Sequence, residues 1–213
     1  MHIVIFGATG LVGSATVKEA LGKGHIVTIL VRTPSKLNIR HPNLKVIKGD
    51  ALDANAVIDA LKGAEAVIQT LGYGGKGDGK PTTFTADATR LILDGMKKHK
   101  VNRIIAMSVA GAGNSISFFP KILTKFVFPT FMKWFVYIIN DKNKMESEIM
   151  NSELDWTIVR SITIKNKPAS GKINPTLDGK NMKYSINVGD VAHFLVQQLT
   201  DNSFSKQAPV ISQ

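Results

Sequence analysis

A short glycine-rich turn near the start of the chain constrains the fold more than any other stretch. It has the sequence Gly7-Ala8-Thr9-Gly10-Leu11-Val12-Gly13, and it lies between an apolar run at 2–6 and a helix-like segment at 14–23. The first glycine allows a tight turn off a strand, the second lets a phosphate approach the backbone, and the third lets a helix pack closely on a sheet. Such a turn presents backbone N–H groups and a helix N-terminus to an anion. The motif therefore predicts a dinucleotide-binding site.

Strand-like and helix-like segments alternate almost to the end of the 213 residues. Repeated strand–helix units predict a parallel sheet with helices on both faces. We therefore expect one α/β domain over 1–213, a Rossmann-type doubly wound sheet with a small C-terminal lobe on the substrate side. Asn187, with Asp190 three residues later, suits the start of the last helix. Strands are predicted at 26–31, 44–48, 64–69, 102–107, 156–160, 184–186 and 208–211, and helices at 53–61, 83–99, 142–151 and 188–199.

Residues that suit a ligand site fall at the carboxyl ends of five of the predicted strands. Parallel strands end at one edge of a sheet, and open α/β sheets bind ligands at that edge. We therefore expect these residues to belong to one site. They are Gly7, Arg32, Asp50, the pair Leu71-Gly72, and Ser108.

The residue after the second strand distinguishes between the two nicotinamide dinucleotides. An acid at this position binds a free ribose 2′-hydroxyl, whereas an arginine accommodates a 2′-phosphate. This chain has Arg32 there, Lys36 four residues later, and no acid between Glu19 and Asp50. A guanidinium group is a permanent charge with a fork of donors that suits a phosphate. The sequence therefore predicts NADP(H) in preference to NAD(H), with Asp50 available to the adenine amine.

The chain is basic and has no cysteine. Lys and Arg number 27 against 16 Asp and Glu, a formal charge of +11, and no acid occurs between Asp94 and Asp141. The basic residues in this acid-free stretch, which include Arg103, form a positive field. Such a field would attract an anionic cofactor or substrate, a membrane surface or nucleic acid. No nucleic-acid motif is present, so we expect no specific nucleic-acid partner, and the five histidines lack metal-ligand spacing. The lack of cysteine and the strand that begins directly at His2 lead us to expect a cytoplasmic protein without a cleaved leader.

Further motifs lie along most of the chain. With the glycine turn they are Val31-Arg32, Lys48-Gly49-Asp50, Ala66-Val67-Ile68, Leu71-Gly72, Ile105-Ala106-Met107-Ser108 and Trp156-Thr157-Ile158-Val159-Arg160. Together they resemble the motifs of the atypical short-chain dehydrogenase/reductases of the NAD(P)-binding, NmrA-like kind, and within that group the chain is similar to the biliverdin reductase B/flavin reductase family. The resemblance implies a Rossmann fold with NADPH across the strand ends and hydride transfer to a flat conjugated acceptor, such as a flavin, a quinone or a linear tetrapyrrole.

The resemblance also implies a role for each matching position. The pyrophosphate would be held by Gly7, Thr9, Gly10, Leu11 and Val12. The 2′-phosphate would be held by Arg32 and Lys36, the adenine flanked by Asp50 and Ala51, and the ribose and nicotinamide path lined by Leu71 and Gly72. Beside the nicotinamide would lie Ser108, the one candidate catalytic residue, and after strand six the segment Ser161, Ile162 and Thr163 would close over it.

One motif of many short-chain dehydrogenases is missing. Their Tyr-x-x-x-Lys pair acts as a general acid or base, but here Tyr137 is followed four residues later by Asp141, with Lys142 and Lys144 nearby. A cofactor that carries the hard chemistry can reduce an acceptor without this pair. The absence weakens the interpretation as a simple alcohol dehydrogenase. It leaves open both a reductase and a non-catalytic NAD(P)-binding redox sensor of the NmrA type that acts through a protein partner.

An apolar insert at about 112–140 distinguishes this chain from flavin reductases. Its residues Phe118, Phe119, Ile122, Leu123, Phe126 and Val127 are expected on one helical face, and Phe128-Pro129 is expected to break the helix. A membrane span needs about 20 apolar residues, and the prolines and lysines here argue against one. Three roles of the stretch Phe118–Ile139 stay open: a lid on a flat substrate, a self-association face in a monomer–dimer equilibrium, or an interfacial anchor on anionic lipid.

Overall fold

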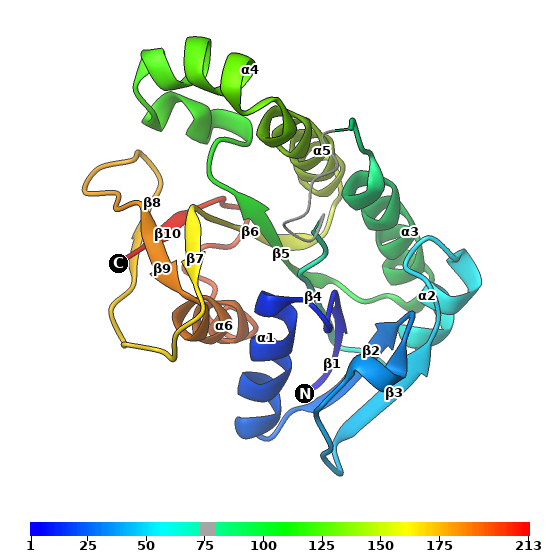
Figure 1. The fold of residues 1–213 in the computed structure, drawn as a ribbon. Helices are drawn as coiled ribbons and strands as arrows, with labels where there is room; N and C mark the ends of the chain where they lie inside the picture. Colours follow the sequence, from blue (N-terminus) through cyan, green and yellow to red (C-terminus); the bar gives the residue numbers. More distant parts are fainter. Residues whose placement is uncertain (73–79) are drawn as a thin grey trace.

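The computed structural model describes residues 1–72 and 80–213, and its central sheet has the strand order β3-β2-β1-β4-β5-β6-β10-β8 (Figure 1). The strands from β3 to β10 are parallel, and β8 pairs antiparallel with β10. This arrangement confirms the predicted doubly wound sheet. Most of the glycine-rich loop that follows Gly72 lies outside the described residues. The bounds are β1 His2–Phe6, β2 Ile26–Val31, β3 Leu44–Lys48, β4 Ala66–Gln69, β5 Arg103–Val109, β6 Asp155–Ser161, β8 Asn174–Thr176 and β10 Val210–Ser212.

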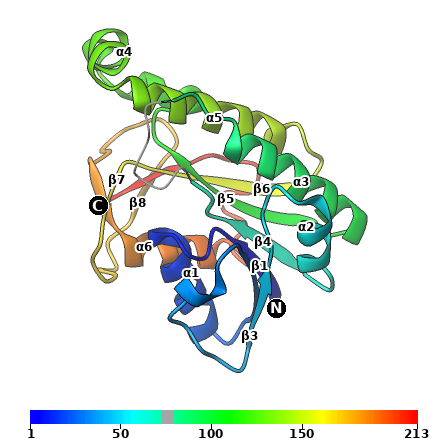
Figure 2. The same ribbon diagram turned by 45° about the vertical axis from the view of Figure 1, so that its right-hand side comes forward.

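Helices cover both faces of the sheet (Figures 1 and 2). On one face α1 (Leu11–Gly22) packs against α6 (Val188–Gln197), and on the other α2 (Ala54–Ala60), α3 (Phe84–His99) and α5 (Lys133–Met150) pack side by side. Strand β1 explains this layering, because alternate residues of a strand point to opposite faces. Ile3 and Ile5 join the apolar cluster under α1 and α6, whereas Val4 and Phe6 join the cluster under α2, α3 and α5.

The C-terminal part of the chain adds the predicted small lobe. Strand β7 (Thr163–Lys165) pairs with β9 (Ser185–Asn187) in a separate two-stranded sheet. The sequence did not predict β7 or β8, because each has only three residues and no clear alternation. Asn187 is the N-cap of α6 and Asp190 lies in its first turn, as predicted, although no side chain caps the helix. The buried carboxylate of Asp190 accepts hydrogen bonds from the backbone N–H groups of Ser170 and Gly171, so it also holds a distant turn.

Residues 113–132 form a helical segment after β5, which we call the cap (Figure 2). It contains η2 (Gly113–Phe118), a π-helical turn η3 (Leu123–Val127) and α4 (Phe128–Phe131). The break predicted at Phe128-Pro129 was wrong, because the helix runs through the proline and ends at Met132, where φ is −125°. The widened π turn lies directly before Pro129, which lacks an N–H for a normal helical hydrogen bond.

The sequence had suggested that the apolar residues of the cap share one helical face, but they do not. Phe119 and Phe128 are buried, whereas Ile122 and Phe126 are exposed. The basic field is also smaller than expected. Arg103 is buried at the start of β5, where its guanidinium donates to Thr157 Oγ1 at 2.8 Å and to the Gln198 carbonyl oxygen at 2.6 Å. Within residues 1–72 and 80–213, no helix has the length and apolarity that a membrane crossing requires.

Candidate functional site

The glycine turn between β1 and α1 leaves no room for side chains at two of its positions. Gly7 has φ of +87°, a conformation that favours glycine. A Cβ added to Gly13 would lie 2.1 Å from the Gly7 carbonyl oxygen and 2.7 Å from Thr70 Oγ1. Among the described residues, a Cβ added at Gly10 would meet only the Gly7 carbonyl oxygen, at 3.4 Å. The turn therefore brings α1 tightly against the sheet and exposes bare backbone at Gly10.

The turn borders a cavity of about 290 Å³, which we call the strand-end cavity. It lies at the carboxyl ends of β1 to β4, and β1 pairs with both β2 and β4, so the strand order reverses here. Open α/β sheets bind ligands at this reversal. The structure brings together here most of the residues predicted to bind the cofactor. The lining includes Gly7, Thr9, Gly10, Arg32, Asp50, Ala51, Leu71 and Gly72, together with Thr70 and Phe84.

The N-terminus of α1 fits a pyrophosphate. Gly10 is the N-cap, it contributes no side-chain cap, and the first turn of α1 contains no acid. The leading N–H groups of a helix need acceptors, and the helix dipole favours a negative charge beside them. In the part of the chain that the structure describes, no carboxylate supplies that charge to this helix. An external phosphate would satisfy the N-terminus.

Arg32 and Asp50 give the strand-end cavity side chains of opposite charge. Arg32 is exposed, and within the described residues no carboxylate lies at ion-pair distance from its guanidinium. Asp50 accepts a hydrogen bond from the Leu52 N–H at 3.0 Å, which orders the turn after β3. The cavity therefore offers one cation near the β2 end and one acceptor near the β3 end.

Three other predicted residues lie beside this cavity and do not line it. Leu11 is half exposed and lines a neighbouring hollow with Thr9 and Gly10. Val12 packs against the core under α1. Lys36 is exposed in the short helix η1 (Pro34–Lys36), which follows β2. Their contacts with a cofactor stay predictions.

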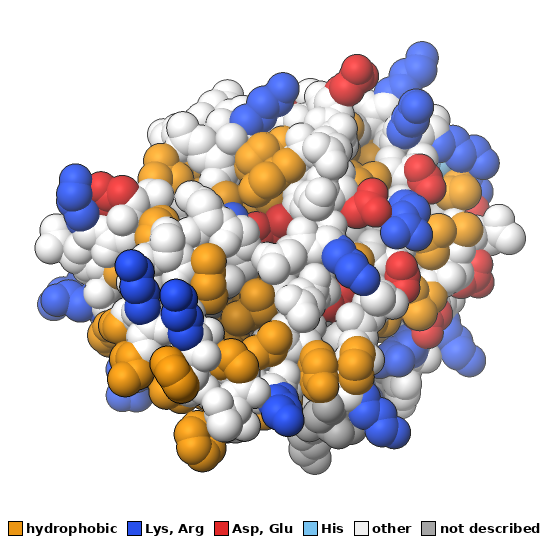
Figure 3. Space-filling view, turned by 90° about the horizontal axis from the view of Figure 1, so that it is seen from above, with side chains coloured by type: hydrophobic (Ala, Val, Ile, Leu, Met, Phe, Trp, Pro, Cys, Tyr) orange, Lys and Arg blue, Asp and Glu red, His pale blue; other side chains and the backbone are white. Residues whose placement is uncertain are grey.

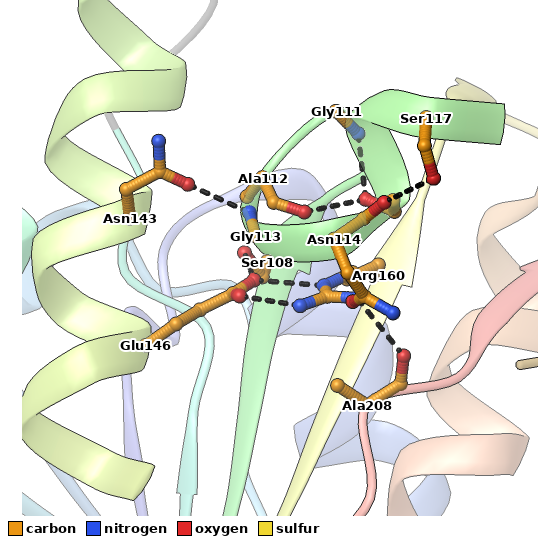
Figure 4. Close-up of polar contacts among 11 residues, drawn as sticks. Ser108, Gly111, Ala112, Gly113, Asn114, Ser117, Asn143, Glu146, Arg160 and Ala208 are labelled. Carbon is orange, nitrogen blue, oxygen red and sulfur yellow. Dashed lines mark hydrogen bonds and ion pairs between the residues drawn. The ribbon is translucent and has the colours of Figure 1, made fainter. Parts of the chain in front are cut away.

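Ser108 is buried in a polar network (Figure 4). It does not line the strand-end cavity. Its hydroxyl donates to Glu146 Oε1 at 2.6 Å. The same carboxylate accepts from Arg160 Nη2 at 2.6 Å and from Arg160 Nε at 3.0 Å. Arg160 Nη1 also donates to Asn114 Oδ1 at 2.7 Å. The network joins β5, β6, α5 and the beginning of the cap, and a catalytic role for Ser108 stays a prediction.

Lys142 connects the segment that follows β4 with the last part of β5. Its Nζ donates to the Leu71 carbonyl oxygen at 2.8 Å and to the Met107 carbonyl oxygen at 2.9 Å. Burial lowers the pKa of this ammonium to about 8, although Asp141 and Glu146 act in the opposite direction. Asp141 accepts from the backbone N–H groups at the start of α3, at 2.9 and 3.0 Å. Both residues therefore anchor α5 beside the strand-end cavity.

A second cavity, of about 340 Å³, lies at the ends of β5 and β6 under the cap; we call it the apolar pocket. Aromatic rings pack edge to face in its wall, with 6.0 Å between the centroids of Phe119 and Phe128 and 5.2 Å between those of Phe128 and Phe135. Two predicted residues, Ile162 and Thr163, line it. Ser161 is buried one residue earlier, and its carbonyl oxygen accepts from the Ala110 N–H at 2.8 Å. The other lining residues are Val109, Ala110, Leu123, Met132, Trp134 and Tyr184.

Sequence reasoning missed the roles of Lys142 and Glu146. Both lie on the buried side of α5, where Met145 and Ile149 pack into the core. A signal was present, because the four residues are spaced i, i+3, i+4 and i+7, which defines one helical face. Two charged residues on an otherwise apolar face indicate buried partners, and the sequence alone does not identify those partners.

Comparisons with known proteins agree with this geometry. A family model described as NAD(P)H-binding matches residues 7–202. The UPF0659 protein YMR090W of Saccharomyces cerevisiae is 26% identical over 209 residues, which cover 93% of this chain and 87% of the yeast protein. The photosystem II assembly factor Ycf39 of Synechocystis is 25% identical over 221 residues, which cover 99% of this chain and 62% of that protein.

Solved structures share the fold. The protein ChuY of Escherichia coli O157:H7, described as an anaerobillin reductase, has a TM-score of 0.79 and 23% identity, with coverage of 99% of this chain and 96% of ChuY. A short-chain dehydrogenase/reductase of Veillonella parvula in complex with NADP has a TM-score of 0.81 and 18% identity, with coverage of 100% and 94%. The match over 7–202 and the glycine turn that begins it lead to one conclusion: this chain belongs to the NAD(P)H-binding family.

Proposed function

We propose that the protein is an NADPH-dependent reductase that transfers hydride to a flat conjugated acceptor. The observation that carries the proposal is the relation between the two cavities. Strands β4 and β5 are neighbours with Gln69 opposite Ala106, and the Lys142 ammonium donates to a carbonyl group just after β4 and to one near the end of β5. The strand-end cavity begins at Leu71 and Gly72, and the apolar pocket begins at Val109 and Ala110. A cofactor that extends along the strand ends would thus meet an acceptor one strand further on.

In this proposal one group of residues binds the charged parts of the cofactor, and another keeps water away from the acceptor. The N-terminus of α1 would bind the pyrophosphate, and Arg32 would bind a 2′-phosphate with a charge-assisted fork of hydrogen bonds. A reduced nicotinamide supplies the hydride when it is bound. The aromatic wall around Phe119 and Phe128 offers flat apolar surfaces to a conjugated ring and keeps water away from it.

The preference for NADPH rests on the two charged residues of the strand-end cavity. Arg32 directly follows β2, at the position that distinguishes the two cofactors, and has no carboxylate partner within the described residues. Asp50 follows β3 instead, and its carboxylate is engaged by the Leu52 N–H. This arrangement favours a phosphorylated ribose.

NADPH consumption by the purified protein tests the proposal. Absorbance would be followed with FMN, riboflavin, a short-chain quinone and biliverdin as acceptors, and NADH would be run in parallel. Turnover with NADPH and little with NADH is expected. The exposed residue Tyr184 lines the apolar pocket, so Tyr184→Ala should raise KM for the acceptor and leave the Kd for NADPH unchanged. The matched control is Leu177→Ala, at another exposed position in the same lobe.

One observation favours a second candidate function, a redox sensor that binds NAD(P) without turnover. Among the residues that the structure describes, those that line the apolar pocket include no carboxylate, histidine or lysine, and the Ser108 hydroxyl is engaged by Glu146. Tight NADPH binding with no consumption on any of the four acceptors would reject the reductase and favour the sensor. A protein partner would then be sought on the cap.

A further inference from the structure

The cap has an outer face that the fold leaves uncovered. Four large apolar side chains lie on it within thirteen residues of sequence. Figure 3 looks down on the side of the molecule that carries the cap, and hydrophobic side chains gather at its lower left with basic side chains beside them. We call this surface the outer face; its residues are Ile122 (67% exposed), Phe126 (68%), Phe131 (81%) and, at its border with the apolar pocket that it also lines, Trp134 (43%).

Other apolar residues of the cap are the ones that pack into the interior. Phe119 and Phe128 are buried against each other, and Leu123 packs against the same cluster. The π turn and α4 therefore divide their apolar residues between an inner side, which closes the apolar pocket, and the outer face. An apolar face that a monomer leaves exposed, with polar residues around it, marks a contact with another surface.

The charges beside the outer face identify the kind of surface. Lys121, Lys125 and Lys133 are exposed within or next to the same segment. No acid occurs in the sequence between Asp94 and Asp141. A second copy of this chain would bring lysines against lysines in a protein of formal charge +11, which opposes self-association. An anionic surface would be attracted instead.

We propose that the outer face docks on an anionic lipid surface. Ile122, Phe126 and Phe131 enter the boundary between headgroups and acyl chains, and the lysines bind the headgroups. This division of apolar and basic residues is that of helices that lie in a membrane interface. An indole has an apolar body and a polar N–H, which suits Trp134 to the headgroup level. Docking does not depend on the proposed reductase activity.

Co-sedimentation with vesicles tests the proposal directly. Vesicles of phosphatidylcholine alone would be compared with vesicles in which phosphatidylglycerol is added, at low and at high salt. The wild-type protein is expected to sediment with the mixed vesicles and to be released by salt. The variant Ile122→Ser/Phe126→Ser/Phe131→Ser should lose most of this binding. Its fold is checked by its NADPH affinity, because the strand-end cavity does not involve these residues.

Fluorescence locates the contact. The chain has two tryptophans, and Trp156 is buried in β6, so a change on vesicle addition reports Trp134. Brominated acyl chains are expected to quench this emission. Replacement of Trp134 by Phe should abolish the quenching while sedimentation persists.

A matched set of charge variants separates docking from general basicity. Lys121, Lys125 and Lys133 are replaced together by Gln, and in the control Lys45, Lys97 and Lys98, which are exposed elsewhere, are replaced together by Gln. Both variants lose three charges, and only the first is expected to lose vesicle binding. Equal losses, or no binding of the wild-type protein to mixed vesicles, would overturn the proposal. A dimer in solution that Phe126→Ser dissociates, without vesicle binding, would assign the outer face to a second copy.

Discussion

Arg160 and Glu146 form a buried ion pair with two hydrogen bonds, 2.6 Å from Nη2 to Oε2 and 3.0 Å from Nε to Oε1. The pair joins β6 to α5 behind the end of β5. Two desolvated charges stabilise a fold little by themselves, because the cost of removing them from water offsets their attraction. Removal of one partner is different, since the other charge is then buried alone.

Glu146→Gln should therefore lower the free energy of unfolding by about 3–5 kcal/mol. The double variant Glu146→Leu/Arg160→Met replaces both charges with apolar groups and should cost less than this single substitution. Urea denaturation of the three proteins measures the difference. A double variant that is less stable than Glu146→Gln would contradict this account of the pair.

Gly13→Ala should destabilise the fold and weaken cofactor binding together, because its Cβ would lie 2.1 Å from the Gly7 carbonyl oxygen. The control lies in the same helix. No atom of the described residues lies within 4 Å of a Cβ added to Gly22, so Gly22→Ala should raise stability by about 0.4–1 kcal/mol. Thermal unfolding and NADPH titration of both variants check the pair. Similar effects of the two substitutions would show that α1 does not need its close approach to the turn.

Lys142 should make the free energy of unfolding of the wild-type protein depend on pH in the alkaline range. Burial lowers its pKa to about 8 in the folded protein, from 10.5, the ordinary value that the unfolded chain retains. Between these values the unfolded chain binds more protons, so the contribution of Lys142 to the free energy of unfolding rises with pH, by up to about 1.4 kcal/mol per pH unit. Below the folded pKa both states are protonated and the contribution is constant.

Urea denaturation of the wild-type protein and of Lys142→Met, from about pH 7 to about pH 10, isolates this effect because other groups titrate alike in both. The stability of the wild-type protein should rise relative to the variant across the upper part of this range. A difference that does not change with pH would contradict the lowered pKa.

Arg32→Asp should weaken NADPH binding far more than NADH binding. A hydrogen bond to a charged group contributes about 1.5–3 kcal/mol, so the additional loss for NADPH should be about 10- to 150-fold. Arg40→Asp is the matched control, because Arg40 is also exposed and lies outside the strand-end cavity. Equal losses of the two cofactors in Arg32→Asp would reject the assigned preference.

The sequence predicted the sheet well because its strands are short apolar, β-branched runs between turn residues. Residues 26–31 and 44–48 have the same bounds in the structure as β2 and β3. The convergence of Gly7, Arg32, Asp50 and Leu71-Gly72 on one cavity followed from the parallel order of the strands. Ser108 was expected at the same cavity but does not line it. It lies inside β5, and its hydroxyl is bound to Glu146.

The cap could not be predicted from its pattern. Apolar residues with helical spacing indicate a face, but a π turn changes the angle between successive residues and distributes them over two faces. Ile122 and Phe126 thus became exposed while Phe119 and Phe128 became buried. Buried charges were equally difficult, since Arg103 and Lys142 resemble surface residues until their partners from distant segments are known.

The cap begins and ends at fixed points. Its first residue, Gly113, donates its N–H to Asn143 Oδ1 in α5, and its last residue, Met132, is the N-cap of the same helix, which Asp141 joins to the start of α3. The cap of residues 113–132 thus leaves the sheet and returns to α5 without contributing a strand to it. An exchange of this segment for another of equal span would leave the strand-end cavity intact, because the residues that line that cavity lie outside the cap, so the two cavities can change independently in this architecture.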